Sequence, residues 1–106
     1  MPPELHALRQ AVAALEPVQA AFDAYQRAAF PERSPQFFAL ELAGEAGEVA
    51  NNEKKVWKGK AVPREHLEDE AADVLIALMN YANSNRIDLA GAVSAKLAEI
   101  ERRRHI

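Results

Sequence analysis

The chain has 106 residues and a formal net charge of −3, from 13 Lys and Arg against 16 Asp and Glu. A length of this order predicts one domain over residues 1–106. The acidic balance argues against a general nucleic-acid binder, which usually carries a basic surface. Because the chain has no cysteine, it has no disulfide framework, thiolate zinc site or cysteine nucleophile.

Targeting and membrane signals are missing from the residues given. No apolar run approaches the roughly 20 residues that cross a bilayer. The opening residues, MPPELHALRQ, lack the basic-then-apolar order of a signal peptide. We therefore expect a cytoplasmic protein that binds neither membranes nor nucleic-acid polymers.

Apolar residues recur at helical spacing along the whole chain and predict four helical segments. The first covers roughly residues 4–29, with Pro17 kinking or dividing it. The second begins with Ser34 as the N-cap, runs to about Trp57 and stops at Gly59. The third covers about 64–84, and the fourth begins after Asp88 as a cap. No strand-like alternation is present, so we expect an all-α, four-helix bundle-like domain.

Acidic residues follow one side of the second segment. Glu41, Glu45, Glu48 and Asn52 stand at i, i+4, i+7 and i+11 and therefore share a helix face. The apolar residues that include Phe38 lie beside this stripe, offset by roughly 60°. The carboxylates thus border the buried face, whereas a purely solvated acidic face would lie opposite it.

The third segment repeats the arrangement, with Glu70 and Asp73 flanking its apolar stripe. Carboxylates that converge from two helices repel one another unless they are protonated or bind cations. A set of oxygen ligands without cysteine and with little histidine suits Mg²⁺ or Mn²⁺. Protein-bound Mg²⁺ commonly completes its shell with water and substrate phosphate. The pattern therefore predicts a metal site for phosphate chemistry.

These residues resemble a known family signature. The run Leu42-Ala43-Gly44-Glu45-Ala46-Gly47-Glu48-Val49, followed by Glu70-Ala71-Ala72-Asp73-Val74-Leu75, is similar to the E-x-x-E … E-x-x-D pattern of MazG-like all-α nucleoside triphosphate pyrophosphohydrolases. Lys96 and Arg103 resemble the K-x₆-R tail of that family, and the resemblance covers roughly residues 25–103. Two departures are Asn85-Arg86, where many relatives have a glycine-containing turn, and the tail's lack of asparagine.

The resemblance implies Mg²⁺-dependent cleavage of a nucleoside triphosphate between its α and β phosphates, as in nucleotide-pool house-cleaning or control. By the motif match, Glu45, Glu48, Glu70 and Asp73 are the metal ligands, and Glu45 or Glu48 is the catalytic base. Mn²⁺ is an alternative metal. The resemblance also implies a homodimer or homotetramer.

Eight further residues are candidates for substrate binding. Lysines and arginine suit phosphates, Trp57 suits stacking on a base, and the amides of Asn52 and Asn80 suit a base or sugar. Trp57 equally suits packing, the lysines equally suit a solvated patch, and Phe37 and Phe38 suit either a base pocket or the core. The candidates are Glu41, Asn52, Lys55, Trp57, Lys58, Asn80, Lys96 and Arg103.

A small-residue face on the second segment, formed by Ala39, Ala43, Gly47 and Ala50, permits close approach of another helix, from this chain or from a partner. Two other functions compete with the hydrolase. A di-iron carboxylate bundle needs Glu-x-x-His motifs, which the sequence lacks. A non-catalytic regulatory module that binds a basic partner through the acidic stripe predicts no metal-dependent pyrophosphate release.

Overall fold

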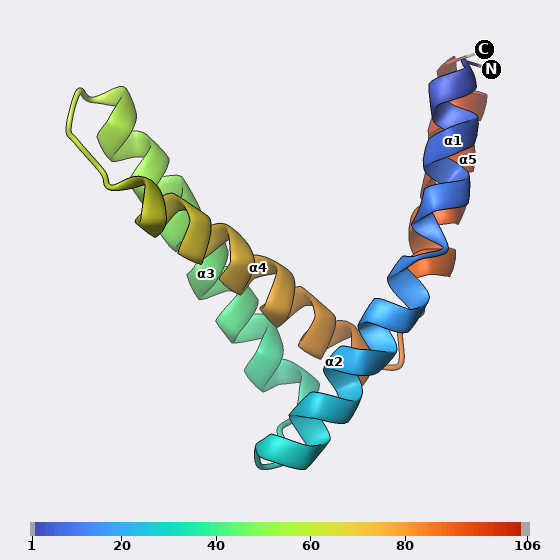
Figure 1. Ribbon diagram of the computed structural model, residues 1–106, viewed down its shortest axis with the longest axis horizontal. Coiled ribbons are helices and arrows are strands. Elements are labelled where there is room, and N and C mark those ends of the chain that lie inside the picture. Colours follow the sequence, from blue (N-terminus) through green and yellow to red (C-terminus); the bar gives the residue numbers. More distant parts are fainter. Residues whose placement is uncertain (1, 105–106) are drawn as a thin grey trace.

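A computed structural model describes residues 2–104 and confirms the all-α class, because the described residues form helices and no strand (Figure 1). The first expected segment is divided at Ala13 and Ala14, ahead of Pro17. Pro17 lies in the first turn of the following helix, where its missing N–H leaves no hydrogen bond unmade. Among the described helices, none combines the length and hydropathy needed for a membrane crossing. The helices are α1 Pro3–Val12, α2 Leu15–Ala29, α3 Pro35–Trp57, α4 Arg64–Ser84 and α5 Leu89–Arg104.

The helix ends follow the predicted signals. The Ser34 hydroxyl accepts a hydrogen bond from the Phe37 backbone N–H at 3.3 Å and caps α3. Gly59 follows α3 with a φ of 84°, a left-handed conformation that glycine adopts without strain. The Asp88 carboxylate accepts from the Gly91 N–H at 3.2 Å and caps α5. The predicted starts of α3 and α5 and the end of α3 are therefore confirmed.

The turn between α4 and α5 keeps the geometry that usually selects glycine. Arg86 has a φ of 56°, and the Ile87 N–H donates to the Ala82 carbonyl at 2.8 Å, as in a Schellman motif. A left-handed conformation costs a non-glycine residue roughly 1–2 kcal/mol. The departure at Asn85-Arg86 therefore retains the turn while straining it.

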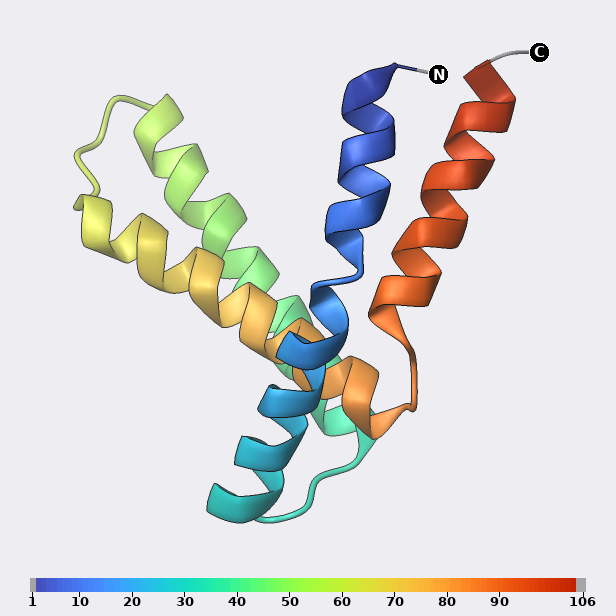
Figure 2. The same ribbon diagram turned by 45° about the vertical axis from the view of Figure 1, so that its right-hand side comes forward.

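The helices form two arms instead of one compact bundle (Figures 1 and 2). α3 and α4 pack as a hairpin in one arm, α1 packs along α5 in the other, and α2 contacts both α4 and α5. The chain measures 41 × 41 × 21 Å, with a radius of gyration of 16.6 Å. A compact domain of this length would have a radius of about 13 Å. The expectation of a bundle within one chain is thus corrected, because the two arms diverge (Figure 1) and, among the described helices, only α2 packs against the hairpin.

The α3–α4 hairpin, which α2 contacts through α4, carries most of the buried apolar side chains: Phe38, Ala77, Met79 and Ala82. Gln19 ties this junction together. Its side-chain amide donates to the Asn83 side chain at 3.1 Å and to the Ile87 carbonyl at 2.7 Å. Its carbonyl accepts from the Leu89 N–H at 3.1 Å, at the start of α5. One buried polar side chain therefore links α2, α4 and α5.

Candidate functional site

The α3–α4 hairpin brings three of the predicted acidic residues together. Glu45 comes from α3, and Glu70 and Asp73, three residues apart, come from one face of α4. One carboxylate oxygen from each of the three lies within 4.8 Å of the others. Glu45 and Glu70 are half-buried and Asp73 is exposed. Three predicted metal ligands thus converge on a single point at the edge of the hairpin.

The electrostatics of this cluster favour a cation. Partial burial raises the pKa of Glu45, and the neighbouring carboxyls of Glu70 and Asp73 raise it further. One oxygen of Glu70, Oε2, is buried and has no hydrogen-bond partner. Within residues 2–104, no side chain of α3 or α4 forms an ion pair. An acidic cluster with an unsatisfied buried oxygen fits a hard divalent cation such as Mg²⁺.

Glu48, the fourth predicted ligand, lies outside this cluster, and its side chain is exposed. It follows Glu45 by three residues, which turns it about 60° away from the line between the two helices. It stays on the same broad side of α3 as Glu41 and Glu45. Its role as a ligand or base stays a prediction.

The other candidates on the hairpin divide between its two ends. Glu41 and Asn80 line cavities near the start of α3. Asn52 is buried farther along α3 and lines neither cavity. Lys55 and Lys58 are exposed at the opposite end. Trp57 is 87% exposed there, so it is not packed against the described part of its own chain.

Lys96 and Arg103 lie on α5, in the other arm, and the structure does not bring them to the carboxylates (Figure 1). Both contact Glu99 on their own helix, at 2.9 Å from the Lys96 Nζ and 2.6 Å from an Arg103 nitrogen. Hydrogen bonding to Lys96 and the charges of Lys96 and Arg102 lower the pKa of Glu99. A substrate contact by Lys96 or Arg103 stays a prediction.

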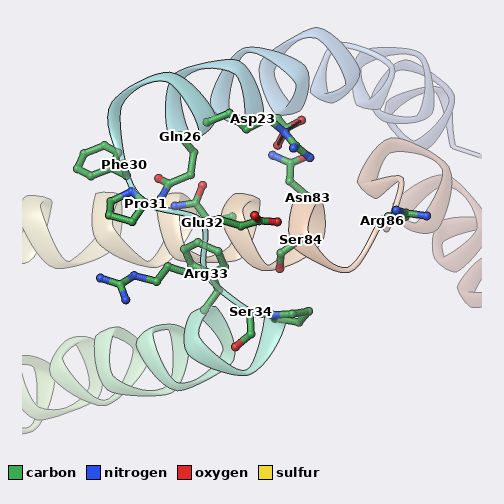
Figure 3. Close-up of a pocket in the computed structure, with 14 residues that line it drawn as sticks. Asp23, Gln26, Phe30, Pro31, Glu32, Arg33, Ser34, Asn83, Ser84 and Arg86 are labelled. Carbon is green, nitrogen blue, oxygen red and sulfur yellow. Dashed lines mark hydrogen bonds and ion pairs between the residues drawn. The ribbon is translucent and has the colours of Figure 1, made fainter.

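Near the start of α3, α2 and its following loop border two adjoining cavities against α3 and α4, and Figure 3 shows the larger one. Their volumes are about 700 and 280 Å³. Gln26, Phe30 and Arg33 line both of them, and the sequence patterns did not single out these residues. No sequence signal could have found them, because they reach the cavities only through the way α2 packs across the hairpin.

The described residues thus define an all-helical protein with a possible metal site on a helical hairpin. Comparison with known families matches residues 33–106, more than two thirds of the chain, to the MazG nucleotide pyrophosphohydrolase domain. The chain therefore belongs to the MazG family of nucleotide pyrophosphohydrolases. Searches of curated proteins and of solved structures found no match.

Proposed function

We propose that this protein hydrolyses nucleoside or deoxynucleoside triphosphates to a nucleoside monophosphate and pyrophosphate, with Mg²⁺ as its metal. In this reaction a water oxygen bonds to the α phosphorus. The bond from that phosphorus to the oxygen bridging the α and β phosphates breaks, and pyrophosphate leaves. Such a reaction serves the removal of unwanted nucleotides or the control of a nucleotide pool.

The observation that carries this proposal is the convergence of Glu45, Glu70 and Asp73 within 4.8 Å, together with the unsatisfied buried oxygen of Glu70. These three residues would hold the metal. A bound divalent ion supplies a water of lowered pKa and neutralises phosphate charge. Glu48, exposed one turn along α3, is available as a further ligand or as the acceptor of the water's proton. A Glu48→Gln variant that binds Mg²⁺ normally but does not turn over would identify the base.

The order of residues along α3 supports the same reaction. Glu41 lines the smaller cavity near the start of the helix, Glu45 is one turn later, and Lys55 lies near its end. Lys55 follows Glu48 by seven residues and therefore shares its helix face. A nucleotide laid along this face has its base at the cavity, its α phosphate at the carboxylates and its terminal phosphates toward Lys55.

The test is pyrophosphate release from a panel of nucleoside and deoxynucleoside triphosphates in Mg²⁺, in Mn²⁺ and in EDTA. In ¹⁸O-labelled water, attack at the α phosphorus places the label in the monophosphate. We expect metal-dependent release with the label there. Label in pyrophosphate, or release of inorganic phosphate, would contradict the proposed bond cleavage. No release from any nucleotide by the folded protein would favour the regulatory module.

We also propose that the chain assembles as a homodimer or homotetramer through the side of α3 opposite the carboxylates. The accessible surface of 7788 Å² exceeds, by about 1,900 Å², the value expected for a compact monomer of 11.7 kDa. A standard interface removes about 800 Å² from each partner. The second copy would cover an exposed, uncharged face made of Ala39, Leu40, Ala43, Ala46, Gly47 and Ala50.

This face spans about 120° of the helix surface, and Leu40 within it is 75% exposed. Sedimentation equilibrium of the wild type should give a multiple of the chain mass. Ala43→Arg, which places a charge in the centre of the face, should shift the protein toward monomers. Ala95→Arg, an equally exposed change on α5, is the matched control. A monomeric wild type would overturn the assembly.

A further inference from the structure

The cavity beside the carboxylates contains a buried amide without a partner. Asn80 lines both the larger and the smaller hollow, and only 8% of its surface is exposed. Within residues 2–104 its side chain makes no hydrogen bond, to backbone or side chain. Three residues later on α4, Asn83 exchanges hydrogen bonds with Gln19 and is fully integrated in the fold.

Neither atom of the Asn80 amide is among the fully enclosed polar atoms of the described residues, so the amide stays open to the cavity. A polar group on a largely buried side chain that makes no hydrogen bond to the described chain is free to bond a ligand or a water there. The Asn80 amide borders the cavity, so a molecule seated there can accept from its NH₂ group and donate to its carbonyl. Gln26 of α2 lines both hollows as well, and its side chain also makes no hydrogen bond among the described residues.

The rest of the lining offers flat apolar surface. Phe37 and Phe38 lie edge to face with their ring centres 5.4 Å apart, and both line the smaller hollow. Phe30, which Figure 3 labels at the end of α2, lines both hollows, and 48% of its surface is exposed. Arg33 lies over the Phe37 ring at 4.9 Å, so its charge is placed against an aromatic face. Rings beside free amides suit a planar molecule with donors and acceptors along its edge.

The cavity is also placed where the proposed reaction needs it. Glu41 lines the smaller hollow and precedes Glu45 by one turn, about 6 Å along α3. Asn80 follows Asp73 by seven residues on α4 and therefore shares its helix face, about 10 Å away along the axis. The cavity and the carboxylate cluster thus follow one another along the hairpin, although the three clustered carboxylates do not themselves line the cavity.

We infer that this cavity is the nucleobase site of the proposed nucleotide substrate, in which Asn80 and Gln26 hydrogen-bond the edge of the base. This inference rests on the proposed function for the identity of the ligand. Asparagine and glutamine amides pair with base edges through one donor and one acceptor. Aromatic side chains stack on any base, so the amides, and not the rings, set the preference among bases.

The first test is made without metal and without phosphate, so it does not depend on turnover. The four ribonucleosides are added to ¹⁵N-labelled protein in EDTA, and the side-chain amide resonances are followed by NMR. We expect the Asn80 amide to shift in a saturable manner with at least one nucleoside. Gln10, an exposed amide on α1 in the other arm, is the internal control and should not shift.

Pyrophosphate alone, added under the same conditions, separates the base from the phosphate end of the substrate. A shift of Asn80 with pyrophosphate but with no nucleoside would overturn the inference, as would no shift with any of these probes. Nucleoside binding by a protein that releases no pyrophosphate would overturn the proposed reaction and leave the base site standing. Pyrophosphate release without any shift of the Asn80 amide would overturn the base site and leave the proposed reaction standing.

The second test uses two variants and the ratio of kcat/KM between bases. Asn80→Leu keeps the volume while removing both polar atoms. It should raise KM and reduce the preference among bases by on the order of 10-fold to 100-fold. Gln26→Leu, at a partly exposed position, should act in the same direction even if the change at Asn80 prevents folding. Unchanged base preference in a folded Asn80→Leu or Gln26→Leu variant would overturn the assignment.

Discussion

The two arms of the molecule treat acidic side chains in opposite ways. On α5, Glu99 has Lys96 and Arg103 as partners, and hydrogen bonding to Lys96 lowers its pKa. In the α3–α4 arm, Glu45 meets two further carboxyls, and partial burial together with these neighbours raises its pKa. Glu99 is therefore neutralised by basic residues of its own helix, whereas the acidic cluster of the hairpin has no basic partner among the described residues and is left to bind a cation.

The largest effect that tests this contrast is expected from Glu70→Gln. The change removes the charge of the residue with the unsatisfied buried oxygen, and should lower kcat/KM by on the order of 10²–10³-fold. Asp69→Asn, at the adjacent exposed position, is the matched control and should leave pyrophosphate release unchanged. Equal activity of the two variants would show that the acidic cluster does not mark the reactive centre.

Gln19→Leu tests whether the two arms depend on their junction. It removes a side chain that bonds Asn83, Ile87 and Leu89, and leaves their polar groups without partners. We expect the free energy of unfolding in urea to fall by about 2–4 kcal/mol. Gln36→Leu, at an exposed position of α3, should change it little. If both variants are equally stable, the arms are held by apolar packing alone.

Two glycines of α3 test which side of the hairpin is covered in solution. A Cβ built on Gly44 or on Gly47 meets no atom of this chain within 4 Å. In a lone chain, each change to alanine should therefore stabilise the helix by about 0.5–1 kcal/mol. Because Gly47 belongs to the proposed interface, Gly47→Ala should gain less than Gly44→Ala in thermal unfolding. Equal gains would place the interface elsewhere.

The smallest expected effect is a dependence of stability on pH. Because the pKa of Glu45 is raised on folding, the folded state holds its proton more tightly than the unfolded state. Its contribution to stability should therefore grow as pH falls from neutral through the raised pKa. Thermal unfolding in EDTA measures this trend, and Mg²⁺ should suppress it. Glu45→Gln should flatten the trend, and an unchanged slope in that variant would contradict the assignment.

Local signals in the sequence were sufficient for the helix ends. Ser34, Gly59 and Asp88 act through neighbours in the chain, so their effects follow from residue type and position. The convergence of Glu45 with Glu70 and Asp73 was also within reach, because both helices of the hairpin carry their acids beside an apolar stripe. Glu48 does not join this cluster, because it follows Glu45 by three residues and is therefore rotated about 60° around α3, away from α4.

The separation of the arms and the lining of the cavity could not be predicted in the same way. Gln26 and Phe30 show no special spacing relative to the acidic residues, and they reach the cavity because α2 crosses the hairpin. That crossing depends on contacts between residues more than 60 positions apart, such as Gln19 with Asn83. Helical periodicity carries no information about such distant pairs.

The acidic cluster lies on the α3–α4 hairpin, whereas α2 forms one wall of the cavity. The shape of the cavity can therefore change in evolution or design without moving the carboxylates. Glu45, Glu70 and Asp73 keep their spacing as long as α3 and α4 stay packed. Substitutions at the α2 residues that line the cavity, Asp23, Gln26 and Arg27, alter the cavity and leave the Gln19 junction in place. Selectivity among ligands can therefore be redesigned by randomising these positions and residues 30–33 while the acidic hairpin and Gln19 are held constant.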